Sequence, residues 1–146
     1  MAKSELPCRS VGIFIRNKAD PKKFLCLYRK VQPKGLAMPA GHKNPGEEVG
    51  EAARREAAEE TGIRIINMIR LAEIPVMDVE CSRGEKTHWW TVFEVVSYEG
   101  EPKLMEPEKH EFVKWMTAEE IAAYVKKDDC DPSWSRKLWR VLEIIS

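Results

Sequence analysis

The chain has no excess of charge, no long apolar run and no closely spaced cysteines, and each absence excludes a class of protein. Its 146 residues carry 24 basic and 24 acidic side chains. Proteins that coat nucleic acid usually have a basic excess, so we expect no stable nucleic-acid partner. No run of about 18 apolar residues occurs, and the N-terminal residues lack the apolar core of a signal peptide. We therefore expect a cytoplasmic protein without membrane association.

The spacing of the cysteines excludes a further kind of site. The four cysteines form no CxxC pair of the kind that binds zinc or performs redox chemistry, and we expect them to be reduced: Cys8, Cys26, Cys81 and Cys130. The sequence contains no repeat, low-complexity tract or interdomain linker. Its length is that of one domain, so we expect residues 1–146 to form a single domain.

Strand and helix patterns alternate along the chain. Period-two and β-branched patterns predict strands at 10–16, 24–29, 87–97 and 112–116, one or two strands in 63–80, and a short strand at 36–39 within a proline-rich loop. Helices are expected at 47–61, at 117–127 behind a capping box, and from Asp131 onward, with a hairpin turn at 82–86 and a loop at 98–111. This order predicts a layered α/β or α+β fold.

The helix at 47–61 carries a stripe of negative charge. Glu56, Glu59 and Glu60 have the i, i+3, i+4 spacing that places side chains on one side of a helix. Like charges at this spacing repel one another, and Arg55 alone cannot neutralise all three. A hard divalent ion such as Mg²⁺ or Mn²⁺ can, because it prefers carboxylate oxygens. The alternative is a solvated acidic face, which such runs often form.

The loop before this helix favours the site over the solvated face. Gly41 and Gly46 allow the backbone to approach a ligand closely, and Pro45 stiffens the turn between them. A backbone carbonyl in this loop could complete the oxygen shell of a metal. Such an ion usually takes its remaining ligands from water and substrate phosphates.

The segment from Gly41 to Ile63 resembles the Nudix box, whose pattern is G-x5-E-x7-R-E-U-x-E-E-x-G-U, with U a bulky apolar residue. Eight positions match at the right spacing: Gly41, Glu47, Arg55, Glu56, Glu59, Glu60, Gly62 and Ile63. Ala57 at the first U is the one departure, and alanine is common there in the family. Outside the box, residues 24–29 and 38–41 resemble the family more weakly.

The resemblance implies a fold and an activity. The fold is the Nudix-type α/β/α sandwich with a mixed sheet. The activity is metal-dependent hydrolysis, with Mg²⁺ or Mn²⁺, of a nucleoside diphosphate linked to another group. The segment at 101–115 is similar to MutT-like enzymes, which implies cleavage of a nucleoside triphosphate to monophosphate and pyrophosphate. Hydrolysis of a nucleotide sugar, ADP-ribose or a dinucleotide is the alternative, and a non-catalytic nucleotide-binding module is a third.

The resemblance also implies roles for the residues of the box. Glu56 and Glu60 would be the principal metal ligands, Glu59 would share ions or water, and the Gly41 carbonyl would complete the shell. Either Glu56 or Glu59 would act as general base. Arg55 would hold Glu47 by a charge-assisted bond that fixes the loop on the helix.

Residues outside the box complete the predicted site. In MutT-like enzymes a glutamate from another loop often joins the metal site, and Glu108 is our choice, ahead of Glu106 and Glu111. Arg29 is a candidate phosphate clamp, or else a surface arginine. Strand alternation places His88 and Trp90 on the face opposite to Trp89, where they either contact the nucleobase or belong to the core. We expect a monomer or homodimer.

Overall fold

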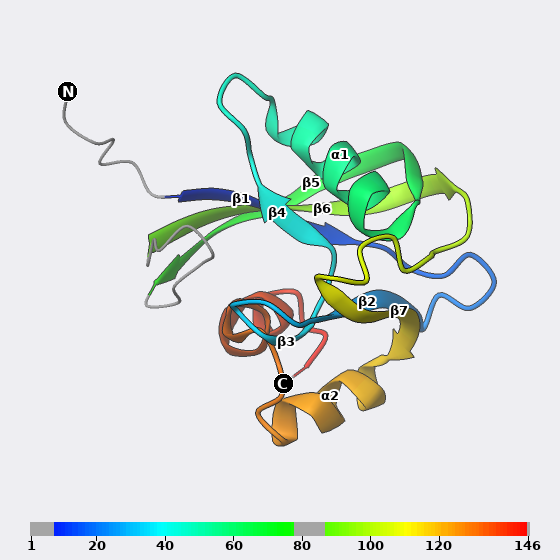
Figure 1. Cartoon of the computed structure of the whole chain (residues 1–146), viewed down its shortest axis with the longest axis vertical. Helices are drawn as coiled ribbons and strands as arrows, with labels where there is room; N and C mark the ends of the chain where they lie inside the picture. The colour runs from blue at the N-terminus through cyan, green and yellow to red at the C-terminus, as the bar shows by residue number, and fades with distance from the viewer. Residues whose placement is uncertain (1–7, 78–86, 146) are drawn as a thin grey trace.

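A computed structural model describes residues 8–77 and 87–145 (Figure 1). In chain order the elements are β1 (Cys8–Phe14), β2 (Lys23–Arg29), β3 (Gly35–Ala37), β4 (Ala40–His42), α1 (Val49–Thr61), β5 (Arg64–Met77), β6 (Thr87–Glu99), β7 (His110–Thr117), α2 (Ala118–Lys126), the π-helical η1 (Trp134–Leu138) and α3 (Trp139–Val141). The predicted strands and helices are present, with shifted ends. The hairpin turn expected at 82–86 lies outside the described residues.

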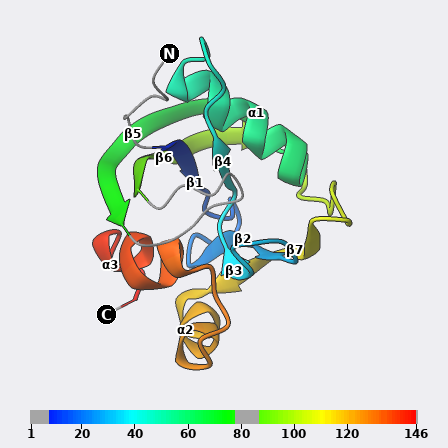
Figure 2. The same ribbon diagram turned by 60° about the vertical axis from the view of Figure 1, so that its left-hand side comes forward.

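The strands form two sheets. A mixed four-stranded sheet has the order β4-β1-β6-β5, in which β1 runs parallel to β6, and a three-stranded antiparallel sheet has the order β3-β2-β7. Helix α1 lies over the mixed sheet, and the C-terminal helices lie near β3 (Figures 1 and 2). The prediction of an α+β fold with a mixed sheet is confirmed. The sequence patterns did not indicate the second sheet.

The core has two apolar clusters, and one of them fixes where α1 lies. In one, three alanines of α1 pack against the mixed sheet, and Ile13 and Phe93 are among their neighbours. The small alanine side chains allow the helix to approach the sheet closely, which leaves the opposite helix face for charged residues. In the other cluster, Trp134 and Trp139 are fully buried beside strands of both sheets.

Capping groups hold α1 at both ends. Glu48 and Glu51 form a capping box at the N-terminus, and Gly62 adopts φ +76° and donates its N–H to the Ala58 carbonyl at the C-terminus. The predicted helix end at Gly62 is therefore confirmed. Thr117 caps α2 with Glu120, also as predicted.

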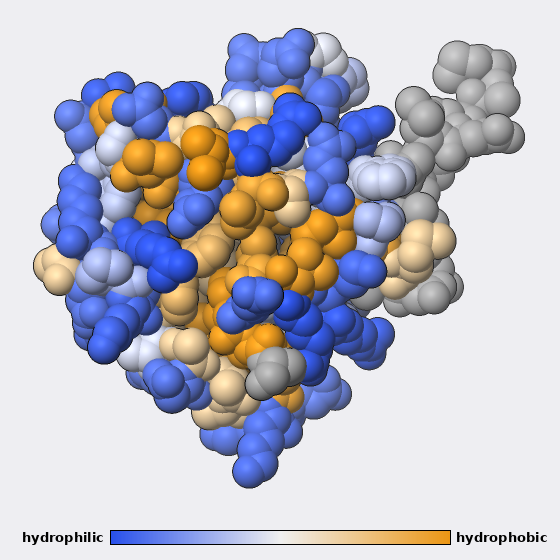
Figure 3. Space-filling model, turned by 180° about the vertical axis from the view of Figure 1, so that it is seen from behind, coloured by the Kyte–Doolittle hydropathy of each residue, from blue (hydrophilic) through white to orange (hydrophobic). Residues whose placement is uncertain are grey.

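The back of the molecule is partly apolar. Figure 3 shows apolar side chains gathered across the centre of that face, between polar margins. The exposed large apolar side chains include Ile69 and Leu71 on β5, which is an edge strand of the mixed sheet, and Val96 on β6. Within the described residues, no helix combines the length and the apolar character needed to cross a bilayer.

Candidate active site

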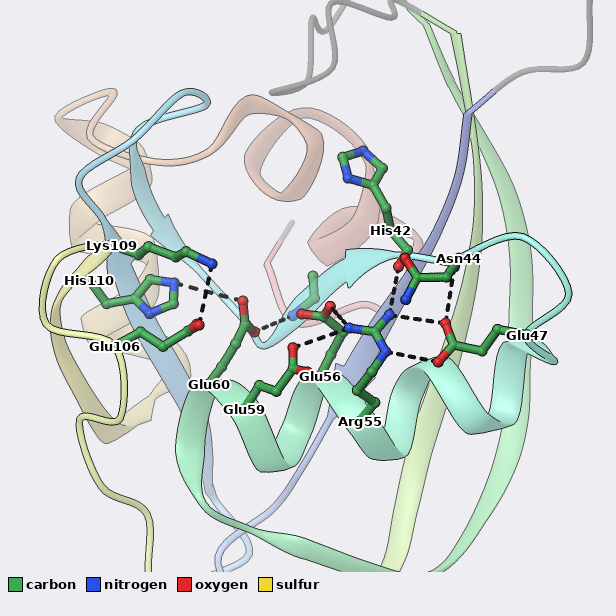
Figure 4. Close-up of polar contacts among 11 residues, drawn as sticks. His42, Asn44, Glu47, Arg55, Glu56, Glu59, Glu60, Glu106, Lys109 and His110 are labelled. Atoms are coloured by element: carbon green, nitrogen blue, oxygen red, sulfur yellow. Dashed lines mark hydrogen bonds and ion pairs between the residues drawn. The ribbon is translucent and has the colours of Figure 1, made fainter. Parts of the chain in front are cut away.

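Arg55 organises the outer face of α1 (Figure 4). Its guanidinium donates to both carboxylate oxygens of Glu47 (2.8 and 3.0 Å), to Glu56 (2.5 Å), to Glu59 (3.1 Å) and to the backbone carbonyl of His42 (2.9 Å). The bonds from Arg55 to Glu47 lower the pKa of Glu47 to about 2, and they raise the pKa of Arg55. The loop at 42–47 is thereby fastened to the helix, and the predicted Arg55–Glu47 bond is present.

Gly41 on β4 lies directly against Glu56. A Cβ atom at this position would stand 2.1 Å from the carboxyl carbon of Glu56, a distance at which any side chain would displace the carboxylate. Glycine at this position therefore leaves room for the Glu56 carboxylate against β4. Glu56 is largely buried, and burial raises its pKa despite the bond from Arg55.

Glu60, one turn further along α1, is buried, and no lysine or arginine of the described residues forms an ion pair with it. It is 5% exposed, and one of its oxygens accepts the backbone N–H of Ala40 (2.9 Å). The other oxygen lies 3.7 Å from Nε2 of His110. Burial lowers the pKa of His110 to about 4, so this imidazole is neutral at pH 7 and supplies no charge. Burial and the nearby Glu56 raise the pKa of Glu60 well above its ordinary value.

Glu106 joins Glu60 and His110 to form a group suited to a metal ion. One potential ligand atom from each of the three lies within 4.8 Å of the others. Burying an ionised carboxylate among other carboxylates is costly unless a cation compensates the charge. Carboxylate oxygens are the preferred ligands of Mg²⁺ and Mn²⁺, and an imidazole nitrogen is also acceptable to Mn²⁺. The donor set at Glu60 therefore fits a hard divalent cation.

The loop glutamate in this group is Glu106, whereas the sequence analysis placed Glu108 first. The turn before β7 explains the difference. The N–H groups of Lys109 and His110 both donate to the Glu106 carbonyl (2.9 Å each), which brings Glu106 beside His110. Glu108 lies in that turn, is exposed, and is not part of the group. Lys109 pairs with Glu106 at 3.3 Å.

Glu59 is the most accessible glutamate of the stripe. Its side chain is 50% exposed, and Arg55 pairs with it at 3.1 Å. It is not a member of the group at Glu60. Glu59 is therefore accessible to water, whereas the largely buried Glu56 and Glu60 line the cavity.

The three predicted substrate-binding residues line one cavity with the glutamates. The cavity has a volume of about 290 Å³, and Glu56 and Glu60 share it with Arg29, His88 and Trp90. The guanidinium of Arg29 donates to the backbone carbonyls of Pro33 (2.7 Å) and Gln32 (3.2 Å), so the loop after β2 fixes its direction.

The alternation predicted for the start of β6 is confirmed. His88 and Trp90 are 2% and 7% exposed, whereas Trp89 on the other face is 38% exposed. Trp90 packs edge-on against Trp134, with ring centroids 5.7 Å apart, so it is a fixed wall of the cavity and part of the core at the same time. Sequence reasoning missed His110 and Asp131. Asp131 was noted only as the start of a helix.

The chain matches known proteins over most of its length. The family model described as the NUDIX domain matches residues 6–138. A MutT NUDIX hydrolase from Burkholderia pseudomallei is 26% identical, with a TM-score of 0.69, over 80% of this chain and 87% of that chain. A NUDIX hydrolase from Nitrosomonas europaea is 26% identical, with a TM-score of 0.65, over 86% and 80%. The NUDIX domain of Shewanella oneidensis NrtR, solved with ADP ribose, is 15% identical, with a TM-score of 0.68, over 82% and 79%.

Proposed function

Because the chain belongs to the NUDIX domain family and is a hydrolase of pyrophosphate bonds in nucleoside diphosphate derivatives, we propose that its substrates are nucleoside triphosphates. The products are the nucleoside monophosphate and pyrophosphate. The similarity of 101–115 to MutT-like enzymes and the 26% identity to a MutT NUDIX hydrolase support this choice.

The observation that carries the proposal is the buried charge at Glu60. Its carboxylate shares the cavity with Glu56 and lies beside Glu106. Among the described residues no lysine or arginine forms an ion pair with it, and the nearby positive charge of Arg29 does not prevent burial from raising its pKa. Glu56, Glu60 and Glu106 would hold Mg²⁺, with Mn²⁺ as a substitute. A bound divalent ion offsets phosphate charge and lowers the pKa of water, which is the chemistry that this reaction needs.

The remaining residues bind and orient. Arg29 and Lys109 line the cavity and bring positive charge to the phosphate chain. Arg55 holds Glu56 and Glu59 in place, and one of these two carboxylates takes the proton of the attacking water. Glu59 is accessible to water, whereas Glu56 is nearer to the buried carboxylates.

One observation favours a second candidate substrate. The NrtR domain with the same fold was solved with ADP ribose, although at 15% identity the likeness concerns the fold alone. A diphosphate-linked sugar or a dinucleotide presents the same pyrophosphate bond to the same glutamates. The two substrate classes differ in the product, because a triphosphate releases pyrophosphate and a diphosphate-linked sugar does not.

The test is the release of phosphate and pyrophosphate from a nucleotide panel in the presence of Mg²⁺. The panel holds canonical and oxidised triphosphates, nucleotide sugars, ADP-ribose and a dinucleotide, and each is given to the wild type, Glu60→Gln and Glu119→Gln. Glu119 is an exposed residue of α2 and serves as the matched control. We expect pyrophosphate from at least one triphosphate, lost in Glu60→Gln and kept in Glu119→Gln. Turnover of diphosphate-linked substrates alone would replace the triphosphate proposal, and binding without turnover would leave a nucleotide-binding module.

A further inference from the structure

His110 is a buried side chain whose ring receives no hydrogen bond from the described residues. It is 1% exposed and begins β7, where it pairs with Arg29 on β2. Nδ1 of its imidazole is buried and has no hydrogen-bond partner in the described part of the chain. Nε2 lies 3.7 Å from Oε2 of Glu60, which is too long for a hydrogen bond. Burying a polar ring without a partner costs stability, so an apolar side chain would serve the core better at this position.

The Nε2 side of the ring faces the carboxylates of the candidate metal group. Glu60 reaches this group from α1, and Glu106 reaches it from the loop before β7 (Figure 4). The Ala40 N–H holds one oxygen of Glu60 at 2.9 Å, and the other oxygen is the one nearest to Nε2. The backbone N–H of His110 donates to the Glu106 carbonyl at 2.9 Å, which ties the ring to the loop. The three side chains are therefore brought together by bonds made within the fold.

An imidazole among carboxylates changes which divalent ion a site prefers. Mg²⁺ takes oxygen ligands and keeps several waters, so a ring nitrogen adds little to its binding. First-row transition ions accept imidazole more readily, and Mn²⁺ also accepts the carboxylates that form the rest of the group. A ring nitrogen contributes a lone pair and no negative charge. It therefore discriminates between ions of equal charge, which a further carboxylate would attract alike.

We propose, resting on the metal site of the proposed function, that Nε2 of His110 binds the ion held by Glu60 and Glu106 and makes this site prefer Mn²⁺ to Mg²⁺. Coordination gives the buried imidazole the partner that the described residues do not provide. Mg²⁺ still binds through the carboxylates, so hydrolysis with Mg²⁺ is compatible with this preference. His110 is then the residue that sets the ion specificity of the site.

The test is the coupling of bound Mn²⁺ to nitrogen, measured by electron spin-echo envelope modulation on the protein with Mn²⁺ and no nucleotide. A nitrogen bonded to Mn²⁺ modulates the echo in a way that oxygen ligands do not. We expect this modulation in the wild type, with altered frequencies when the histidines carry the heavy nitrogen isotope. It should be absent in His110→Gln, whose amide offers an oxygen instead, and in Glu60→Gln, which removes a ligand of the same ion.

The ion preference should change with the same substitution. The signal of free Mn²⁺ in electron paramagnetic resonance gives the affinity for Mn²⁺, and competition by Mg²⁺ gives the affinity for Mg²⁺. We expect the ratio of the two affinities to fall at least about tenfold in His110→Gln, as for lost groups around a metal. His42→Gln is the matched control, because His42 also lines the cavity but its ring points away from the glutamates (Figure 4). It should keep both the modulation and the preference.

Several outcomes would overturn the proposal. Nitrogen modulation that is absent from the wild type, or that persists in His110→Gln, would show that His110 does not bind the ion. An equal loss of affinity for Mn²⁺ and Mg²⁺ would mean that His110 only supports the fold. Where His110→Gln does not fold, the wild type and Glu60→Gln decide, because modulation that Glu60→Gln keeps comes from another site.

The outcome is separate from that of the hydrolysis assay, because the binding measurements use no nucleotide. Hydrolysis of triphosphates by a protein without nitrogen modulation would refute only the role of His110. Nitrogen modulation in a protein that releases no pyrophosphate would refute only the proposed function.

Discussion

The glutamates at α1 fall into two groups in opposite electrostatic states. Arg55 binds Glu47, which lies before the helix, and Glu59 on it. Glu60, the residue after Glu59, is instead buried with a single backbone donor and another carboxylate nearby. The pKa of Glu47 is lowered to about 2 by its bonds, whereas burial raises that of Glu60. The group around Arg55 contains its counter-ion, whereas no lysine or arginine of the described residues forms an ion pair with Glu60.

The comparison shows how a helix can be both scaffold and site. Arg55 fixes the loop at 42–47 and two glutamates through bonds made within the chain itself. The buried carboxylate of Glu60 then creates affinity for a cation at one place. Preorganised ligands cost less to assemble when the ion binds.

Removing the buried carboxylate of Glu60 should have the largest effect on activity. Glu60→Gln should lower Mg²⁺-dependent hydrolysis on the order of 10³-fold, because a Lewis-acidic metal supplies several kcal/mol. The same change should raise the melting temperature of the metal-free protein, since it removes a buried carboxylate without a cation. Mg²⁺ should stabilise the wild type and Glu119→Gln more than Glu60→Gln. If metal-free Glu60→Gln melts at a lower temperature than the metal-free wild type, the Glu60 carboxylate does not destabilise the fold as proposed.

Removing the internal cation should have the next largest effect and the opposite sign on stability. Arg55→Ala leaves Glu47, Glu56 and Glu59 without their donor, so activity should fall about 100-fold, as for lost supporting groups around a metal. The melting temperature should fall by several degrees. Arg64→Ala breaks an exposed pair with Glu99 on the surface and is the matched control, with little change expected. Equal effects of the two substitutions would show that Arg55 is an ordinary surface arginine.

Substitutions of two loop glutamates test which of them belongs to the group around Glu60. Glu106→Gln should lower activity about tenfold and weaken Mg²⁺ dependence, because Glu106 lies with Glu60 and His110. Glu108→Gln, two residues further along the same turn, should leave activity within about twofold, as for an exposed residue. The measurement is the initial rate as a function of Mg²⁺ concentration. If Glu108→Gln lowers activity more than Glu106→Gln does, Glu108 is the loop glutamate of the metal site.

The smallest effect is a pH dependence of stability that comes from the Glu47–Arg55 pair. The folded-state pKa of Glu47 lies below its ordinary value, so its bond to Arg55 stabilises the fold above about pH 4.5. That contribution is lost as the pH falls from about 4.5 towards 2. In denaturant unfolding, the free-energy difference between wild type and Glu47→Gln should be present at pH 6 and shrink towards pH 3. If the difference in the free energy of unfolding stays constant between pH 6 and pH 3, protonation of Glu47 does not contribute to the pH dependence of stability.

Local sequence signals identified the helix and its charges but not the partners from other elements. The spacing of Glu56, Glu59 and Glu60 predicts one helix face, and Gly62 predicts where the helix ends. Whether Glu106 or Glu108 joins the metal site depends on the backbone hydrogen bonds of a turn, and the residue pattern does not predict these bonds. Asp131 and His110 reach the cavity through the packing of both sheets, which periodicity along one segment cannot reveal. The second sheet was missed for the same reason.

The parallel pairing of β1 with β6 has a consequence for the order of folding. Cys8 to Phe14 pair with His88 to Glu94, about eighty positions later in the chain, and β6 separates β1 from β5 in the sheet. During synthesis, the whole helix that carries the glutamates emerges before the central strand that supports it exists. Long-range parallel pairs form slowly because a large loop must close first. We therefore expect the nascent chain to acquire affinity for metal only after residues 87–117 have been made, late in translation.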